Sequence, residues 1–427
     1  MKFYKDTIQK SYYPGPAYRI SYLIYIIRTF SAPCLLSLQP SEKTETMLKF
    51  FKKALGNSKS LMRDGKPTSR PRFHNLRVQD ITRETEDCVS IAFEIPEDLS
   101  EHYRFIPGQY LTLEAEINGE AVRRSYSLCS SPADGELRVA VKKVEDGRFS
   151  SWANTELTVG TEMRVMTPEG KFNAIIDKAH RHNYVAFAAG SGITPVFSIM
   201  KSVLEMEPES TFTLFYGNKT SNTIIFRDKI DGLKNRYMNR LEVHHILSRE
   251  DQGTDYLKGR IDEGKCISFS EKFFDPADTD AFFICGPEAM INCVNDSLTK
   301  MGVSTNKIHY ELFTSPSQNI AHKTKVSAGK KQETIKSEVT VILDGEETHF
   351  GIASDGKAIL DAALDAGADV PYACKGAVCC TCRARVLEGS VEMEMNYALE
   401  DDEVEDGYVL TCQSHPTSDK VVVSYDE

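Results

Sequence analysis

The sequence predicts a multidomain protein in which an antiparallel β-barrel is followed by a doubly wound, parallel-sheet α/β domain and then by a small α+β domain. Three observations predict this order. Apolar residues alternate with period two from Phe73 to about Thr167, apolar strands alternate with helices from Asn183 to Phe313, and residues 374–382 read CKGAVCCTC. A chain of 427 residues is long enough for each domain to bury its own core.

The barrel is predicted from short segments of alternating polarity. Residues 88–96, CVSIAFEIP, place Val89, Ile91 and Phe93 on one face of a strand. Residues 110–120, YLTLEAEINGE, alternate in the same way, and Asn118-Gly119 supplies a tight hairpin turn. Several such strands separated by turns indicate a barrel, although any all-β module fits the pattern.

The α/β domain is predicted from buried strands that alternate with helices. Apolar runs with the length of strands occupy residues 183–189, 211–217, 241–247, 280–286 and 307–313. Residues 195–206 and 287–298 have the spacing of helices. This alternation is typical of a doubly wound parallel sheet.

The C-terminal domain begins with two strands and a helix. Residues 338–352 form a predicted hairpin around Asp344-Gly345, and residues 357–367, KAILDAALDAG, form a helix that ends at Gly367. The preceding segment, TSPSQNIAHKTKVSAGKKQETIK, has no sustained apolar pattern and is interpreted as a linker. The predicted boundaries are therefore 1–68 (N-terminal extension without an assigned function), 69–174 (barrel), 175–313 (α/β domain), 314–336 (linker) and 337–427 (C-terminal domain).

Charge and cysteine usage restrict the functional class. The net charge is −11, but residues 337–427 hold 20 Asp and Glu against 5 Lys and Arg, so the first 336 residues carry about +4. A basic body with an acidic C-terminal domain argues against general nucleic-acid binding and favours an acidic module that docks on basic surfaces. The run EDDEVED at 400–406 belongs to that acidic surface, or it is simply a solvated face. Eleven cysteines without a small secreted framework favour a reducing cytoplasm.

The N-terminus contains one short apolar run, ISYLIYII at residues 20–27. Eight residues are too few to cross a bilayer, which needs about 20. No small-residue cleavage site follows convincingly, so a signal peptide is the weaker interpretation. A cytoplasmic protein without stable membrane insertion is expected.

The cysteine cluster has the spacing of an iron–sulfur centre. Cys374, Cys379 and Cys382 follow a C-x4-C-x2-C pattern, and Cys412 lies 30 residues further on. This three-plus-one arrangement is that of a plant-type [2Fe–2S] site, in which each iron takes two thiolates and two bridging sulfides. A structural zinc site is the alternative, although zinc sites more often come as two close pairs. Cys380, next to Cys379, is expected to point elsewhere as a free thiol.

The segment from Val339 to Glu427 closely resembles plant-type ferredoxin domains, which implies the β-grasp fold. Its departure from that pattern is Cys380, where many members carry glycine. The resemblance leaves the four cluster ligands unchanged, and the extra thiol adds sensitivity to oxidation.

RSYSLCSSP at 124–132 resembles the flavin signature of the ferredoxin–NADP reductase family, and VKKVEDGRFSSWA at 141–153 resembles its second flavin segment. The arginine can pair with a flavin phosphate through its planar fork. The tyrosine can lie against the flavin, the second serine can bond near N5, and a helix that opens after the glycine suits a pyrophosphate. The resemblance implies FAD contacts from Arg124, Ser125, Tyr126, Ser127, Val141, Lys142, Gly147, Phe149 and Ser150.

AAGSGITP at 188–195 and CGPEAM at 285–290 correspond to the nicotinamide-nucleotide segments of the same family. Glycines let the main chain approach a pyrophosphate at the start of a helix. The resemblance places Cys285 beside the nicotinamide and makes it, with Ser127, a candidate catalytic residue; a buried small hydrophobe is the alternative for Cys285. The expected nucleotide contacts are Gly190, Ser191, Gly192, Thr194, Pro195, Gly217, Ser248, Arg249, Cys285, Gly286 and Pro287.

The choice of nucleotide depends on the charges expected at its 2′ position. Ser248 and Arg249 follow the strand 241–247, and Lys219 follows the strand 211–217. Serine and arginine at this place resemble relatives that prefer NADP, because an acidic residue favours a free ribose hydroxyl. NADPH is therefore the expected substrate, with Arg249 on a solvated loop beside Glu250 and Asp251 as the alternative.

The domain order and the similarity over about residues 70–427 resemble the reductases of phenylacetyl-CoA epoxygenase complexes. That resemblance implies FAD, a [2Fe–2S] cluster and NADPH, with electrons passing to a di-iron monooxygenase in phenylacetate catabolism. Another acceptor, such as a Rieske oxygenase, a desaturase or a hybrid-cluster protein, fits the same motifs. An inactive, zinc-stabilised binding protein on a reductase-like scaffold is the remaining alternative.

Overall fold

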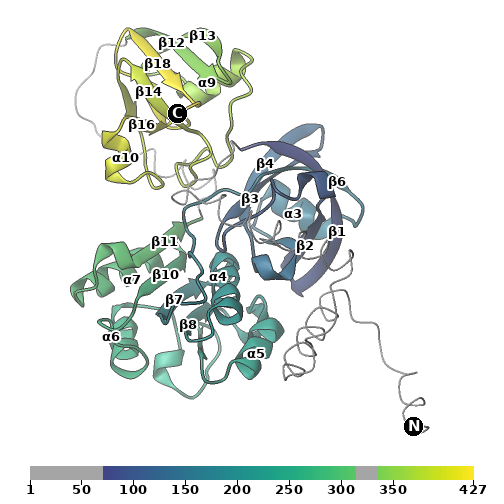
Figure 1. The fold of residues 1–427 in the computed structure, drawn as a ribbon, viewed down its shortest axis with the longest axis vertical. Coiled ribbons are helices and arrows are strands. Elements are labelled where there is room, and N and C mark those ends of the chain that lie inside the picture. The colour runs from purple at the N-terminus through teal and green to yellow at the C-terminus, as the bar shows by residue number, and fades with distance from the viewer. Residues whose placement is uncertain (1–70, 314–334) are drawn as a thin grey trace, which may run out of the picture. The chain divides into compact units, whose positions relative to one another are not determined.

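The computed structural model describes residues 71–313 and 335–427, which form three successive domains (Figure 1). The predicted N-terminal extension and all but the last two residues of the predicted linker lie outside the described residues. Within the described ranges, no helix is long and apolar enough to cross a membrane.

The first domain is an antiparallel β-barrel, as the period-two pattern predicts. Its six strands are hydrogen-bonded in the order β4-β3-β6-β1-β2-β5. The β3–β4 hairpin turns at Asn118 and Gly119, which both have positive φ, as this tight turn requires. The elements are β1 (Phe73–Thr85), β2 (Cys88–Glu94), β3 (Tyr110–Ile117), β4 (Glu120–Ser127), β5 (Leu137–Lys142), α3 (Arg148–Thr155) and β6 (Glu162–Met166).

The second domain is a parallel five-stranded sheet in the order β11-β10-β7-β8-β9. The strands β7 (Asn183–Ala189), β8 (Thr211–Asn218), β9 (Leu241–Leu247), β10 (Ala281–Gly286) and β11 (Ile308–Leu312) match the five predicted runs closely. The helices are α4 (Ile193–Met206), α5 (Arg227–Arg236), α6 (Glu263–Lys272) and α7 (Glu288–Lys300). Helix α4 begins two residues before the predicted start, because Pro195 lies in its first turn, where the missing N–H costs nothing.

The third domain is a mixed sheet with one main helix, as expected for an α+β module. Its strands are ordered β13-β12-β18-β14-β16, and β12 pairs with β18 in parallel. Helix α9 packs its buried residues Ile359 and Leu360 into the same core as Val339 and Val423. The elements are β12 (Lys336–Leu343), β13 (Glu346–Ala353), α9 (Ile359–Asp365), β14 (Arg383–Glu388), β15 (Val391–Met393), α10 (Asp401–Glu405), β16 (Tyr408–Leu410), β17 (Ser414–Pro416) and β18 (Lys420–Ser424).

Candidate functional site

A cavity of about 970 Å³ opens at the carboxyl ends of β7, β8, β9 and β10. Because β8 and β10 flank β7 on opposite sides, the chain reverses its direction of winding here, and ligands of open parallel sheets bind at such a point. Of the predicted contacts, the cavity is lined by Lys142, Gly190, Ser191, Gly192, Gly217, Ser248, Arg249, Gly286 and Pro287. Thr194 and Pro195 are buried in the first turn of α4 instead.

Gly192 allows the turn after β7 to approach the end of β10. A Cβ atom built on Gly192 would lie 2.1 Å from the backbone oxygen of Cys285, which is closer than real contacts allow. Gly190, at the start of the same short 3-10 turn, has a φ of +56°. The glycine spacing is therefore required by the crossing of two backbone segments as well as by any ligand.

We expect Gly192→Ala to disrupt this crossing. The added methyl group meets the backbone of Cys285 and Gly286, so one of the two segments must shift, and we expect a loss of stability of about 2–4 kcal/mol. Chemical denaturation of the purified protein checks this value. Gly232→Ala, an exposed helix position with open space around it, is the matched control and should leave stability nearly unchanged or slightly raised.

Three cationic side chains line one edge of the cavity. Lys219 follows β8, and Arg249 follows β9. Arg260 lies on a later segment, which is held to the end of β9 by the hydrogen bond from Gly259 N–H to the Leu247 oxygen (2.9 Å). The Arg249 N–H donates to the Lys219 oxygen (2.8 Å), which holds the first two segments together. In the described part of the chain none of the three cations forms an ion pair.

The acidic neighbours of Arg249 are occupied elsewhere. The Glu250 carboxylate accepts the Ser221 N–H (2.7 Å), and Asp251 pairs with Lys258 at 2.8 Å. Sequence reasoning missed Arg260. Its place in the cavity depends on the hydrogen bond between Gly259 and the end of β9, and no sequence motif indicates that contact.

The two predicted flavin segments meet in the barrel. The ring of Tyr126 on β4 lies 5.5 Å from that of Phe149 on α3, measured between centroids, so the segments pack against each other. Gly147 caps α3, and a Cβ atom there would lie 2.4 Å from Ser150 Oγ. Ser150 Oγ accepts the Val144 N–H (3.1 Å) and donates to the Gly147 oxygen (3.2 Å), so this hydroxyl closes the loop.

Arg124 is the cation of this region. It is half-buried, donates to the neighbouring Arg123 oxygen (2.6 Å), and forms no ion pair with any described residue. An uncompensated guanidinium near a glycine-capped helix start suits an anionic phosphate. Ser125 bonds across the hairpin to Thr112 at 3.3 Å, and Val141 is buried in β5 beside Lys142.

Ser127 connects the barrel to the parallel sheet. Its Oγ donates to Glu311 Oε2 (3.1 Å), and Glu311 on β11 is the register partner of Cys285 on β10. Burial raises the pKa of Glu311 to about 8, although the Ser127 hydrogen bond opposes the shift. The Cys285 thiol is fully buried, which raises its pKa, and it does not line the cavity. Sequence reasoning missed Glu311. The one feature that could have marked it is that an acidic residue interrupts an otherwise largely apolar predicted strand.

The four predicted cluster cysteines lie together. They come from the loop before β14 and from the segment between β16 and β17. The loop curls through positive φ at Lys375 (51°) and Ala377 (61°), whereas Gly376 between them has no positive φ. The Gly376 N–H donates to Cys374 Sγ (3.3 Å). Ala377 is fully buried, so a larger side chain would not fit at this position without repacking.

The sulfur atoms are arranged as two interacting pairs. A hydrogen bond from Cys374, with others from Thr381, lowers the pKa of Cys379 to about 6, and a hydrogen bond from Cys382 lowers the pKa of Cys412. Four neighbouring sulfur atoms arranged as two pairs fit the donor set of a two-iron cluster, in which each iron takes two thiolates. Cys380 points away, with its Sγ 3.3 Å from the Ala398 oxygen, as expected. The ten described cysteines form no disulfide.

The cluster loop also contacts the barrel. The Tyr110 hydroxyl lies 3.0 Å from Thr381 Oγ1, and the buried Tyr110 ring packs with Ala373 and Cys379. Lys171 forms an ion pair with Glu403, the third residue of α10. Part of the acidic run at 400–406 is thus engaged within the molecule.

Comparison with known sequence families accounts for all three domains. Residues 75–174 match the oxidoreductase FAD-binding domain, residues 187–296 match the oxidoreductase NAD-binding domain, and residues 341–417 match the 2Fe-2S iron-sulfur cluster binding domain. The presence of flavin-binding, nicotinamide-nucleotide-binding and [2Fe–2S] domains, expected from the sequence, is thus confirmed.

Two curated relatives extend along most of the chain. A component of the 1,2-phenylacetyl-CoA epoxidase of Escherichia coli (strain K12) is 44% identical over 355 residues, which cover 83% of this chain and 98% of the relative. The ferredoxin reductase component of the 3-ketosteroid-9-alpha-monooxygenase of Rhodococcus rhodochrous is 33% identical, over 82% of this chain and 96% of the relative.

The fold has solved counterparts. Phthalate dioxygenase reductase aligns with a TM-score of 0.51 at 22% identity, over 82% of this chain and 98% of that one. An intact type IV self-sufficient cytochrome P450 monooxygenase aligns with a TM-score of 0.58 at 22% identity, over 87% of this chain and 44% of that one. Three matched domains and 44% identity along a whole relative place the chain in the ferredoxin–NADP reductase family, as an oxidoreductase with a C-terminal [2Fe–2S] domain of the kind that forms the reductase component of oxygenases.

Proposed function

We propose that the protein oxidises NADPH in preference to NADH and delivers the electrons to the di-iron oxygenase component of a phenylacetyl-CoA epoxidase. The observation that carries the nucleotide preference is the edge formed by Lys219, Arg249 and Arg260, three cations without acidic partners in the described residues. A 2′-phosphate supplies the missing negative charge, whereas a free ribose hydroxyl leaves the cations uncompensated.

Arg249→Ala should separate the two nucleotides. A charge-assisted hydrogen bond to phosphate is worth about 1.5–3 kcal/mol, so we expect kcat/KM for NADPH to fall by about 10–100-fold and that for NADH to change less than threefold. Steady-state reduction of ferricyanide measures both. Lys258→Ala, on the same loop but paired with Asp251, is the control and should leave the ratio unchanged. Equal kcat/KM values for NADPH and NADH in the unaltered protein would refute the preference.

We assign the individual residues as follows. Arg124 and the first turn of α3 after Gly147 hold the flavin phosphates, and Tyr126, with Phe149 behind it, supports the ring. Ser127 donates toward the reacting edge of the flavin and, in the present geometry, toward Glu311. When bound, the flavin supplies the conversion between paired and single electrons, and the cluster carries single electrons onward.

The remaining chain residues position these groups. Ser191, Gly192, Gly286 and Pro287 let backbone approach the nucleotide. The backbone of Cys285 supports the turn at Gly192, and its side chain packs in the core below. Tyr110 and Thr381 keep the cluster loop against the barrel. The contact is short and partly apolar, so Cys379, which would hold the cluster, lies directly against the domain that would hold the flavin.

The acceptor is proposed from the extent of similarity. The epoxidase component matches over 98% of its length at 44% identity, whereas the reductase component of the 3-ketosteroid monooxygenase matches at 33%. Reconstitution tests the choice: the holoprotein is mixed with an epoxidase oxygenase component and phenylacetyl-CoA, or with a 3-ketosteroid oxygenase and its steroid. We expect substrate-dependent NADPH consumption only in the first mixture. Turnover only in the second mixture would overturn this assignment and keep the reductase class.

A further inference from the structure

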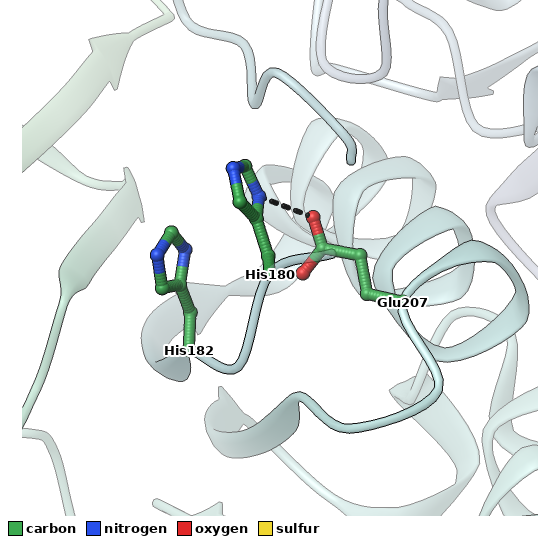
Figure 2. A group of neighbouring side chains, drawn as sticks. All are labelled: His180, His182 and Glu207. Atoms are coloured by element: carbon green, nitrogen blue, oxygen red, sulfur yellow. Dashed lines mark hydrogen bonds and ion pairs between the residues drawn. The ribbon is translucent and has the colours of Figure 1, made fainter. Parts of the chain in front are cut away.

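A cluster of two histidines and a glutamate lies at the edge of the parallel sheet opposite to the nucleotide cavity. His180 and His182 directly precede β7, and Glu207 directly follows α4 (Figure 2). Because a strand and the helix that follows it run in opposite directions, the start of β7 and the end of α4 meet at one edge. The cavity lies at the other end of both elements, so this cluster is no part of the redox site.

The backbone around the cluster is fixed by hydrogen bonds from several elements. The His182 N–H donates to Ser210 Oγ (3.0 Å), and the His180 N–H donates to the Asp177 oxygen (2.9 Å). The Arg240 guanidinium donates to the Glu207 oxygen (2.8 Å) and to the Leu204 oxygen (2.6 Å), which caps the end of α4. The three side chains are thus presented from a rigid frame.

The side chains themselves face one another. The imidazole rings are stacked with centroids 4.2 Å apart, and His180 Nδ1 lies 2.9 Å from Glu207 Oε1 (Figure 2). His182 Nδ1 lies 2.9 Å from the Tyr184 hydroxyl. One potential ligand atom from each of the three residues lies within 4.8 Å of the other two.

Glu207 carries an unsatisfied oxygen at this place. Its side chain is fully buried, and Oε1 accepts the Asp177 N–H (3.1 Å) as well as facing His180. Oε2 is buried and has no hydrogen-bond partner among the described residues. A buried carboxylate oxygen without a partner is costly, so a group that pairs with it is expected.

We propose that His180, His182 and Glu207 form a binding site for a divalent transition-metal ion, Zn²⁺ by ligand chemistry. Two imidazole nitrogens and one carboxylate oxygen are a donor set that Zn²⁺ takes in tetrahedral geometry, and the partial exposure of His180 leaves the fourth position to water. Ca²⁺ and Mg²⁺ prefer oxygen ligands and fit less well. The Tyr184 hydroxyl supplies the outer hydrogen bond that orients a metal-bound imidazole.

The ion would fasten the loop before β7 to the end of α4. Both ligand-bearing segments flank the first βα unit of the parallel sheet, so metal binding adds to the stability of this domain. Since the site is remote from the nucleotide cavity, it is structural, and no electron passes through it.

Equilibrium dialysis of the flavin- and cluster-loaded full-length protein against ZnCl₂, followed by metal analysis, tests the proposal. Loaded protein is required because empty cluster cysteines also take up zinc. We expect about one Zn²⁺ per chain in the unaltered protein and about none in His182→Gln or Glu207→Gln. His349→Gln is the matched control, because His349 faces Glu347 at 3.4 Å without a second histidine nearby, and it should keep the bound zinc.

A second readout is independent of stoichiometry. Added Zn²⁺ should raise the melting temperature of the unaltered protein and of His349→Gln, but should leave His182→Gln unchanged. NADPH-dependent ferricyanide reduction should be the same in all four proteins, which shows that they are folded. Equal zinc content in the unaltered protein and in His182→Gln, with no thermal shift, would mean that the cluster is a hydrogen-bonded charge network only.

Discussion

Replacing Cys382 with serine is expected to abolish electron delivery to one-electron protein acceptors while sparing the NADPH-to-flavin half of the reaction. Cys382 is almost fully buried and interacts directly with Cys412, so its loss removes one of the two sulfur pairs. A serine hydroxyl is a poor substitute for a thiolate in an iron–sulfur centre. We expect cytochrome c reduction to fall more than about 100-fold, because the route from the barrel to the acceptor is interrupted at the loop that contacts Tyr110.

The measurement compares two acceptors in the same preparation. Ferricyanide, a small acceptor that reaches the flavin directly, should still be reduced within about threefold of the original rate. Iron and sulfide analysis should show loss of both elements. Cys380→Ser is the matched control, since the Cys380 sulfur faces the Ala398 oxygen and lies outside the two pairs, and it should keep iron, sulfide and cytochrome c reduction. Full cytochrome c reduction by Cys382→Ser would remove Cys382 from the ligand set.

The prediction of elements from the sequence succeeded where one physical signal was dominant. The parallel strands were located to within one or two residues. The signal was clearest for β7, which is a continuous apolar run buried on both faces. The hairpin turns at Asn118-Gly119 and Asp344-Gly345 were located because only a few residue types tolerate two successive positive φ values. The cysteine spacing predicted which four cysteines lie together for a similar reason: iron–sulfur chemistry restricts both the residue type and the interval.

The site was only partly predictable, because several of its contacts join segments that are distant along the chain. Arg260 reaches the cavity through the pairing of Gly259 with the end of β9, and Glu311 reaches Ser127 across 184 residues. Single-sequence patterns carry no information on such partners. The backbone of the cluster loop shows the same limit: its positive φ values fall on Lys375 and Ala377, and Gly376 contributes its N–H to Cys374 Sγ.

Glu311→Gln is expected to lower the rate of NADPH-dependent ferricyanide reduction by about 100-fold, the scale of losing one positioned proton-holding group. Glu311 is half-buried and receives the Ser127 hydroxyl, and burial raises its pKa to about 8, so the carboxyl group keeps its proton at neutral pH, where an ordinary glutamate has lost it. A protonated carboxyl group that bonds to the serine of the flavin segment can hold and return a proton. Glutamine keeps the size and the hydrogen bond but cannot titrate.

The dependence on pH distinguishes this role from simple packing. If the protonated carboxyl group is the active form, the activity of the unaltered protein falls as pH rises through about 8, and Glu311→Gln shows a low rate without that decline. Because the Ser127 hydrogen bond lowers the pKa of Glu311, Ser127→Ala should move the decline to higher pH. Glu288→Gln is the control, because Glu288 is a carboxyl group that lines the cavity, and it should keep the decline in place.

The pH dependence of the free energy of unfolding tests the raised pKa of Glu311 independently of activity, and its direction can be stated in advance. The folded protein retains the Glu311 proton between pH 4.5 and about 8, whereas the unfolded chain releases it near 4.5, so the stabilising effect of this proton is lost as pH rises across that window. The difference in unfolding free energy between the unaltered protein and Glu311→Gln should therefore shift in favour of the variant from pH 5 to pH 8.5. Denaturant unfolding at several pH values measures it, and an unchanged difference would contradict the raised pKa.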